Sequence, residues 1–194
     1  MDQIQPSKAR EIIGQKANPE QLNMIPERDG GDFMCVLYHT GDYRESSLAM
    51  EQRSVVIIDG DLDLDGGIVD CSGLYDDFSL LIVLGSVRCR NLASTAAVYI
   101  HEDLSVSDIL YYNSFGECTL EVQGALKAGV FAYDENQVIK AQSISGERVF
   151  KLDGDEGLEE LRPLIRPDLQ KLFDEDFEEG FLKELALVES ALST

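Results

Sequence analysis

The stretch Val56-Ile57-Ile58-Asp59-Gly60-Asp61-Leu62-Asp63-Leu64 is the first copy of the pattern that decides the fold. It consists of an alternating apolar segment, two residues that usually include glycine, and a second alternating apolar segment. Later copies, within residues 54–146, are centred on Leu84-Gly85, His101-Glu102, Gln123-Gly124 and Ala141-Gln142. Alternation with a period of two indicates β-strands rather than helices. A recurrence of about twenty residues indicates a stacked repeat.

Stacking the copies predicts a mainly β protein, a single-stranded β-helix (β-solenoid) of about five to six irregular rungs. Glycine is expected at the corners, where a side chain would be crowded. Equivalent apolar residues should form three interior columns. These columns are Val56, Leu81, Val98, Leu120 and Val138; Leu62, Val87, Leu104, Leu126 and Ile144; and Leu64, Cys89, Val106 and Ala128. An irregular opening rung is expected where Leu37, His39, Gly41 and Tyr43 match Val56, Ile58, Gly60 and Leu62.

The chain is expected to form one compact domain with a cover over each open end of the solenoid. Residues 1–53 form the N-terminal cap, with a short helix over 7–15 that Ser7 caps, Ile12 and Ile13 dock and Gly14 ends. Pro19 is expected to break regular structure. Residues 54–152 form the solenoid, whose longest inserted loops are expected at 66–80 and 107–119.

Residues 153–194 are expected to form an acidic, helical C-terminal cap. The apolar spacing predicts one helix over 156–165, with Leu158, Leu161 and Ile165 on one face. It predicts a second helix over 177–192.

The charge balance is the strongest compositional signal, with 37 acidic residues against 16 basic ones and a formal net charge of −21. Such a chain repels nucleic acid and anionic membranes and attracts basic proteins. High net charge also simply keeps a protein soluble. No apolar run is long enough to span a bilayer, and no secretory signal is visible. The four cysteines form no CxxC pair, which favours reduced thiols and a cytoplasmic location.

Asp61-Leu62-Asp63-Leu64-Asp65-Gly66 resembles the opening of a calcium-binding loop. Its twelfth position is Ser72, where a bidentate glutamate is needed. Because Leu62 and Leu64 belong to the interior columns, the aspartates are better interpreted as the outward side of a strand.

The sequence predicts no catalytic, metal or cofactor site. His39 and His101 have no nearby ligand set at metal-binding spacing, and no nucleophile, zinc or phosphate-loop motif is present. The expected protein is therefore non-enzymatic.

Two kinds of surface residue are the candidates for partner binding. Aromatic residues in an inserted loop and on the next rung would supply buried anchors at an interface, although they can equally pack as a satellite core. Acidic residues of the first copy and of the C-terminal segment would attract a basic partner, although they can equally be solvated surface. The candidates are Tyr111, Tyr112, Tyr133, Asp59, Asp61, Asp63, Asp65, Asp174, Glu175, Asp176, Glu178 and Glu179.

The segment Leu81-Ile82-Val83-Leu84-Gly85-Ser86-Val87, and Tyr112-Asn113 ahead of the rung at 120–124, resemble a group of small bacterial proteins. They are similar to bactofilin-like polymer-forming proteins and to solenoid proteins found beside polymorphic or type VI secreted toxins. The resemblance covers residues 36–146. The acidic ends and the helical C-terminus depart from bactofilins, which argues against a filament.

The resemblance and the charge together predict an immunity protein that neutralises a basic secreted toxin, such as a nuclease, by covering its active-site cleft. The predicted partner is that toxin, and not nucleic acid or a membrane. The alternative is a self-assembling structural solenoid of the bactofilin type, and an enzyme is the third class.

Overall fold

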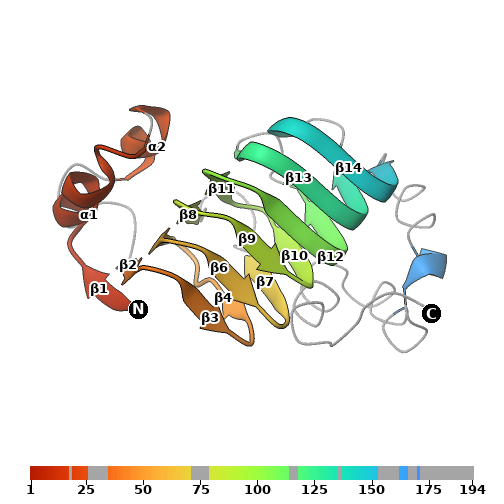
Figure 1. Cartoon of the computed structure of the whole chain (residues 1–194), viewed down its shortest axis with the longest axis horizontal. Coiled ribbons are helices and arrows are strands. Elements are labelled where there is room, and N and C mark those ends of the chain that lie inside the picture. Colours follow the sequence, from red (N-terminus) through yellow and green to blue (C-terminus); the bar gives the residue numbers. More distant parts are fainter. Residues whose placement is uncertain are drawn as a thin grey trace.

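A computed structural model shows the chain as a parallel β-solenoid with two short helices packed against one side (Figure 1). The structure describes residues 1–17, 19–25, 35–70, 79–113, 118–134, 137–152, 162–165 and 170. The predicted β-solenoid is confirmed.

Each rung of the solenoid passes through three faces, and neighbouring rungs pair in parallel. Face 1 contains β2 (Cys35–Thr40), β5 (Ser54–Asp59), β8 (Leu80–Val83) and β11 (Ala97–Ile100). Face 2 contains β3 (Tyr43–Glu45), β6 (Leu62–Leu64) and β9 (Val87–Cys89). Face 3 contains β4 (Leu48–Ala49), β7 (Gly67–Asp70) and β10 (Asn91–Ser94). The long strand β12 (Leu104–Tyr112) covers faces 2 and 3, and β13 (Thr119–Asp134) and β14 (Val138–Leu152) run through all three.

The register of the rungs agrees with the predicted columns except at the last rung. In the opening rung, Leu37 pairs with Val56, His39 with Ile58 and Tyr43 with Leu62, as predicted. The column that runs from Leu62 through Val87, Leu104 and Leu126 to Ile144 is also confirmed. The assignment of Val138 to the first column is wrong. Ile139 pairs with Leu120 instead, and Val138 is 42% exposed.

Gly85 and Gly124 lie at the corner between faces 1 and 2, where successive rungs touch. A Cβ atom on Gly85 would lie 2.7 Å from the backbone carbonyl carbon and oxygen of Gly60. On Gly124 it would lie 2.8 Å from the carbonyl oxygen of Glu102. Glycine at these two positions is therefore a steric requirement of stacking, whereas Glu102 occupies the equivalent corner position on the rung between them.

The N-terminal helices cover a side of the solenoid and not its end. α1 (Pro6–Ile13) and α2 (Pro19–Met24) contribute to a core cluster with the outward-facing side chains of face 1. That cluster includes Ala9, Ile13, Val55, Ile57, Leu80, Ile82, Ala97 and Tyr99. The helices therefore do not cover the end as expected, whereas the predicted opening rung lies there, with β1 (Asp2–Ile4) paired antiparallel with the edge of β2.

The helix boundaries also differ from the sequence prediction. The N-cap of α1 is Gln5, with Pro6 in the first turn, so Ser7 is not the cap. Gly14 ends α1, as predicted. The start of the helix is marked by Pro6 and not by Ser7. Pro19 begins α2 where a break was expected, since proline suits the first position of a helix.

Face 3 was missed by the sequence analysis. Residues 67–70 and 109–112 are strands of this face, where loops were expected. Beyond β4, whose Ala49 is exposed, its apolar side chains that point away from the interior are buried. They are Val69, Ala93, Ile109, Tyr111, Val130 and Ala132.

Little of the predicted C-terminal cap falls within the described residues. Arg162–Leu164 form a 3-10 helix (η1), and Ile165 is fully buried, where the end of an α-helix was expected. The rest of the helices predicted over 156–165 and 177–192 lies outside the described residues.

Candidate binding surface

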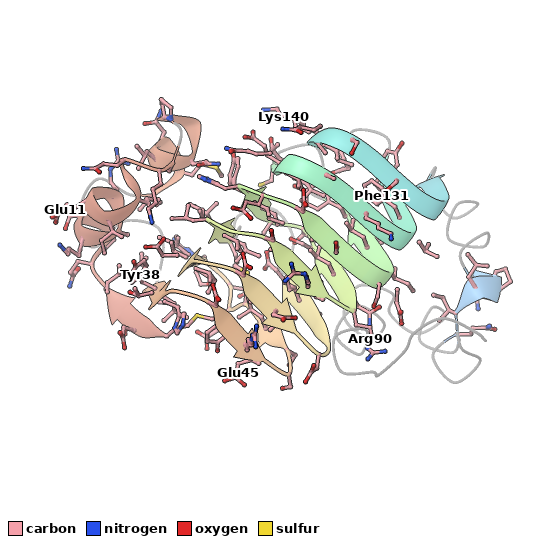
Figure 2. The ribbon with its side chains drawn as sticks, in the orientation of Figure 1. Glu11, Tyr38, Glu45, Arg90, Phe131 and Lys140 are labelled. Carbon is pink, nitrogen blue, oxygen red and sulfur yellow. The ribbon has the colours of Figure 1, made fainter. Side chains whose placement is uncertain are left out.

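Face 2 presents the solenoid's polar outer surface. One outward column crosses all its rungs, with its members paired rung to rung. It reads Arg44, Asp63, Arg88, Ser105, Lys127 and Ser145. Arg44, Arg88 and Lys127 are exposed. The other members of the column, one aspartate and two serines, have shorter side chains. In Figure 2, Glu45 and Arg90 mark the corner where this face ends.

The corner between faces 1 and 2 carries a row of carboxylates that we name the acidic ridge, made of Asp42, Asp61, Glu102 and Asp103. Three of them bind the backbone of the next rung through Oδ1. Asp42 accepts the N–H of Asp61 at 3.1 Å, Asp61 that of Ser86 at 2.8 Å, and Asp103 that of Ala125 at 2.8 Å. The Ser86 hydroxyl donates to Glu102 Oε2 at 2.9 Å. The ridge is therefore a fixed array of negative charge.

Two of the four aspartates predicted from the first copy are ion-paired within the chain. Asp59 lies 2.5 Å from Lys16 Nζ and accepts the Tyr38 hydroxyl at 3.1 Å. The hydrogen bond to Asp59 raises the pKa of Lys16. Asp63 lies 3.8 Å from Arg44 and pairs in the ladder with Arg88. The pair of Lys16 and Asp59 attaches the turn after α1 to face 1, and the pair of Arg44 and Asp63 offsets charge within face 2.

The other two aspartates differ in position. Asp61 belongs to the acidic ridge, whereas Asp65 is exposed at the opposite corner of face 2. Leu62 and Leu64 are buried between them, as predicted from the interior columns. The structure thus brings Asp61 together with residues that were not predicted, Asp42, Glu102 and Asp103. The sequence signal for Asp42 is the Gly41-Asp42 pair, which repeats at the next corner as Gly60-Asp61.

Tyr111 and Tyr112 lie in a strand and not in an inserted loop, and they are buried, as in the alternative in which the aromatic residues pack in the core. Tyr112 is fully buried in β12, and its hydroxyl donates to the carbonyl of Ala96 at 2.9 Å. Tyr111 is 4% exposed. Tyr133 is half-buried, with its ring centroid 5.1 Å from that of Phe131. Their strand continues the β-sheet of face 3, so their side chains alternate between its two buried sides.

The acidic C-terminal candidates cannot be placed on this surface. Asp174, Glu175, Asp176, Glu178 and Glu179 lie outside the described residues.

The histidines and cysteines of the described residues make structural contacts. His101 Nε2 lies 3.1 Å from Gln21 Oε1, which joins α2 to face 1. Burial lowers the pKa of His101 despite the opposing effect of Glu121, so the ring is neutral at pH 7. Burial raises the pKa of the Cys89 thiol to about 12, which makes it a poor nucleophile. Among the described residues no three His, Cys, Asp or Glu side chains are grouped to hold a metal ion.

A cavity of about 460 Å³ opens at the first rung. Its apolar wall is the unstacked end of the interior columns, and its polar lining comes from Gln3, Glu51 and Ser54. The apolar lining residues include Leu37, Tyr43, Leu48, Met50 and Val56. Sequence reasoning did not find this cavity, because it depends on where β1 meets the first rung.

Within the described part of the chain, no helix has the length and apolar character needed to cross a membrane. Comparison of the chain with protein-family models, with curated proteins and with solved structures gives no match.

Proposed function

We propose that this chain is a non-enzymatic binding protein that neutralises a basic protein, as an immunity protein does for a secreted bacterial toxin such as a nuclease. The observation that carries the proposal is the acidic ridge. It presents Asp42, Glu102 and Asp103 as exposed carboxylates in a chain whose formal net charge is −21.

The ridge suits binding because its carboxylates are held in place before a partner arrives. Each hydrogen bond from a backbone N–H fixes one oxygen of Asp42, Asp61 or Asp103 and leaves the other available. Pre-organised charges lose little side-chain entropy on binding. The net negative charge also steers a basic protein towards the surface and speeds association. Covering a toxin's cationic substrate cleft would then block its activity.

The test uses asparagine, which removes the charge and keeps the accepting oxygen. We expect the variant D42N/D61N/D103N to fold normally and to bind the basic product of the adjacent reading frame about ten-fold more weakly at low salt. Titration calorimetry at several salt concentrations measures the change. The matched control is Asp65→Asn, which removes an exposed charge away from the ridge. An affinity that changes neither with salt concentration nor in D42N/D61N/D103N would contradict the proposal.

A second candidate function is self-assembly through the last rung. β14 pairs only with β13 among the described strands, and Val138 and Ile144 at this end are 42% and 48% exposed. Unpaired edges with exposed apolar side chains favour pairing with another chain. If this function holds, Ile144→Lys should convert oligomers to single chains in light scattering, with Ser145→Lys as the control. A single-chain mass for the unaltered protein at high concentration would exclude it.

A further inference from the structure

The central column of face 2 contains a notch, which we name the basic notch, with Ser105 as its floor and Arg88 and Lys127 as its walls. Ser105 pairs with Arg88 on one neighbouring rung and with Lys127 on the other. Neighbouring strands are separated by about 4.8 Å, so the backbones of the two cationic residues are about 10 Å apart. The serine side chain is shorter than those of the arginine and the lysine on either side of it.

The two cations of the notch are free to bind a ligand. Arg44, in the same column, lies 3.8 Å from Asp63, but neither Arg88 nor Lys127 has an ion pair or a side-chain hydrogen bond with a described residue. Both side chains are exposed. Two unpaired cations beside one hydroxyl form an anion site, because all three groups can donate hydrogen bonds.

We propose that the basic notch binds one carboxylate, from an aspartate or glutamate side chain of a protein partner. Arg88 would hold the carboxylate through its guanidinium fork, Lys127 would approach from the other side, and the Ser105 hydroxyl would donate from below.

The surroundings of the notch exclude a polyanion. Asp63 lies on the rung beyond Arg88, and Asp103 precedes Ser105 by two residues on the same rung. Outward positions two residues apart in an extended chain are separated by about 7 Å. A second negative charge on the ligand, placed towards Asp103 or beyond Arg88, would therefore meet an aspartate. A lysine or arginine two residues from the bound carboxylate would instead lie opposite Asp103.

This inference rests on the proposed protein-binding function and refines the partner. The partner would be basic overall, but the segment that lies along β12 would carry an acidic residue with a basic residue two positions away. The alternation of charge would restrict the register of the complex, because a shift by two rungs would place the partner's carboxylate over Asp63.

The test titrates the full chain with a capped peptide that contains Lys-Thr-Glu-Thr-Lys and follows the Ser105 amide and the Arg88 Nε–H by NMR. We expect both signals to move and the matched peptide Lys-Thr-Gln-Thr-Lys to leave them in place. Arg88→Gln and Lys127→Gln should each raise the Kd about five-fold. Lys8→Gln is the control, because Lys8 is exposed on α1 and paired with Glu11 at 2.9 Å.

Three results would overturn the inference: no movement of Ser105 or Arg88 with excess peptide, equal effects of the Glu and Gln peptides, or tighter binding of tetraglutamate. The notch variants and the ridge variant separate the two proposals. If the notch binds the peptide while D42N/D61N/D103N binds the basic partner at full strength, the acidic ridge fails and the notch stands. If D42N/D61N/D103N no longer binds the basic partner and the peptide does not bind the chain, the basic notch fails and the acidic ridge stands.

Discussion

Gly85→Ala should lower the free energy of unfolding by about 3 kcal/mol, because the added methyl group has no space at the corner of the rung. It would lie 2.7 Å from the backbone of Gly60 and against the Asp61 carboxylate. That carboxylate accepts the N–H of Ser86 at 2.8 Å, so moving it also breaks the bond between two rungs. A backbone neighbour cannot rotate away as a flexible side chain can, so the rungs must separate locally.

The matched control is Gly41→Ala in the opening rung. Gly41 has a φ of 84°, but a Cβ atom there would meet nothing within 4 Å. Alanine at this position should cost about 1 kcal/mol, from backbone strain alone. Urea unfolding compares the two variants. If Gly85→Ala costs no more than Gly41→Ala, rung contact is not what requires glycine at the corner.

Ile13→Ala should cost about 3 kcal/mol, and the loss should be concentrated in the N-terminal helices. Ile13 is fully buried in the cluster between α1 and face 1, whereas the adjacent Ile12 is only partly buried there. We therefore expect Ile12→Ala to cost about 1 kcal/mol. The variants change the same residue type in the same helix turn, so helix propensity is matched.

Hydrogen exchange followed by mass spectrometry distinguishes local from global loss. In Ile13→Ala, amides of α1 and α2 should exchange faster, while those of β8 and β11 keep their protection. Equal acceleration throughout the solenoid would show that the helices and the rungs unfold as one unit. A similar cost for both isoleucines would contradict the packing of Ile13 against face 1.

The sequence was sufficient for the rungs because each has a period of two and most have a glycine at the corner. Leu37, Val56 and Tyr43 could be placed in register for that reason. The error at Val138 arose at a corner of different length. β13 has two residues between Val122 and Ala125, and β14 has one between Ala141 and Ser143. Alignment on the corner therefore holds for Ile144 and slips by one residue before it.

The sequence contained evidence that the outer side of face 1 is buried, but the period-two pattern of the copies indicated only the inner side. The runs Val55 to Ile58 and Leu80 to Val83 are apolar at every position, which is typical of strands buried on both sides. Face 3 was harder to predict, since its strands are as short as β4 and, of β4, β7 and β10, only β7 is preceded by glycine. The acidic ridge and the basic notch each combine residues that are far apart in the sequence and meet only when the rungs stack. No single copy of the repeat contains either of them.

The antiparallel strand β1 gives the stack a direction of growth. Every rung-to-rung pairing of the described strands is parallel, so β1 occupies the edge of β2 in an orientation that another rung cannot continue. The remaining first-rung edges, β3 and β4, are only three and two residues long. An additional β-strand, from this or another chain, would therefore pair with β14. An engineer who wished to lengthen the solenoid should add new repeats on that side.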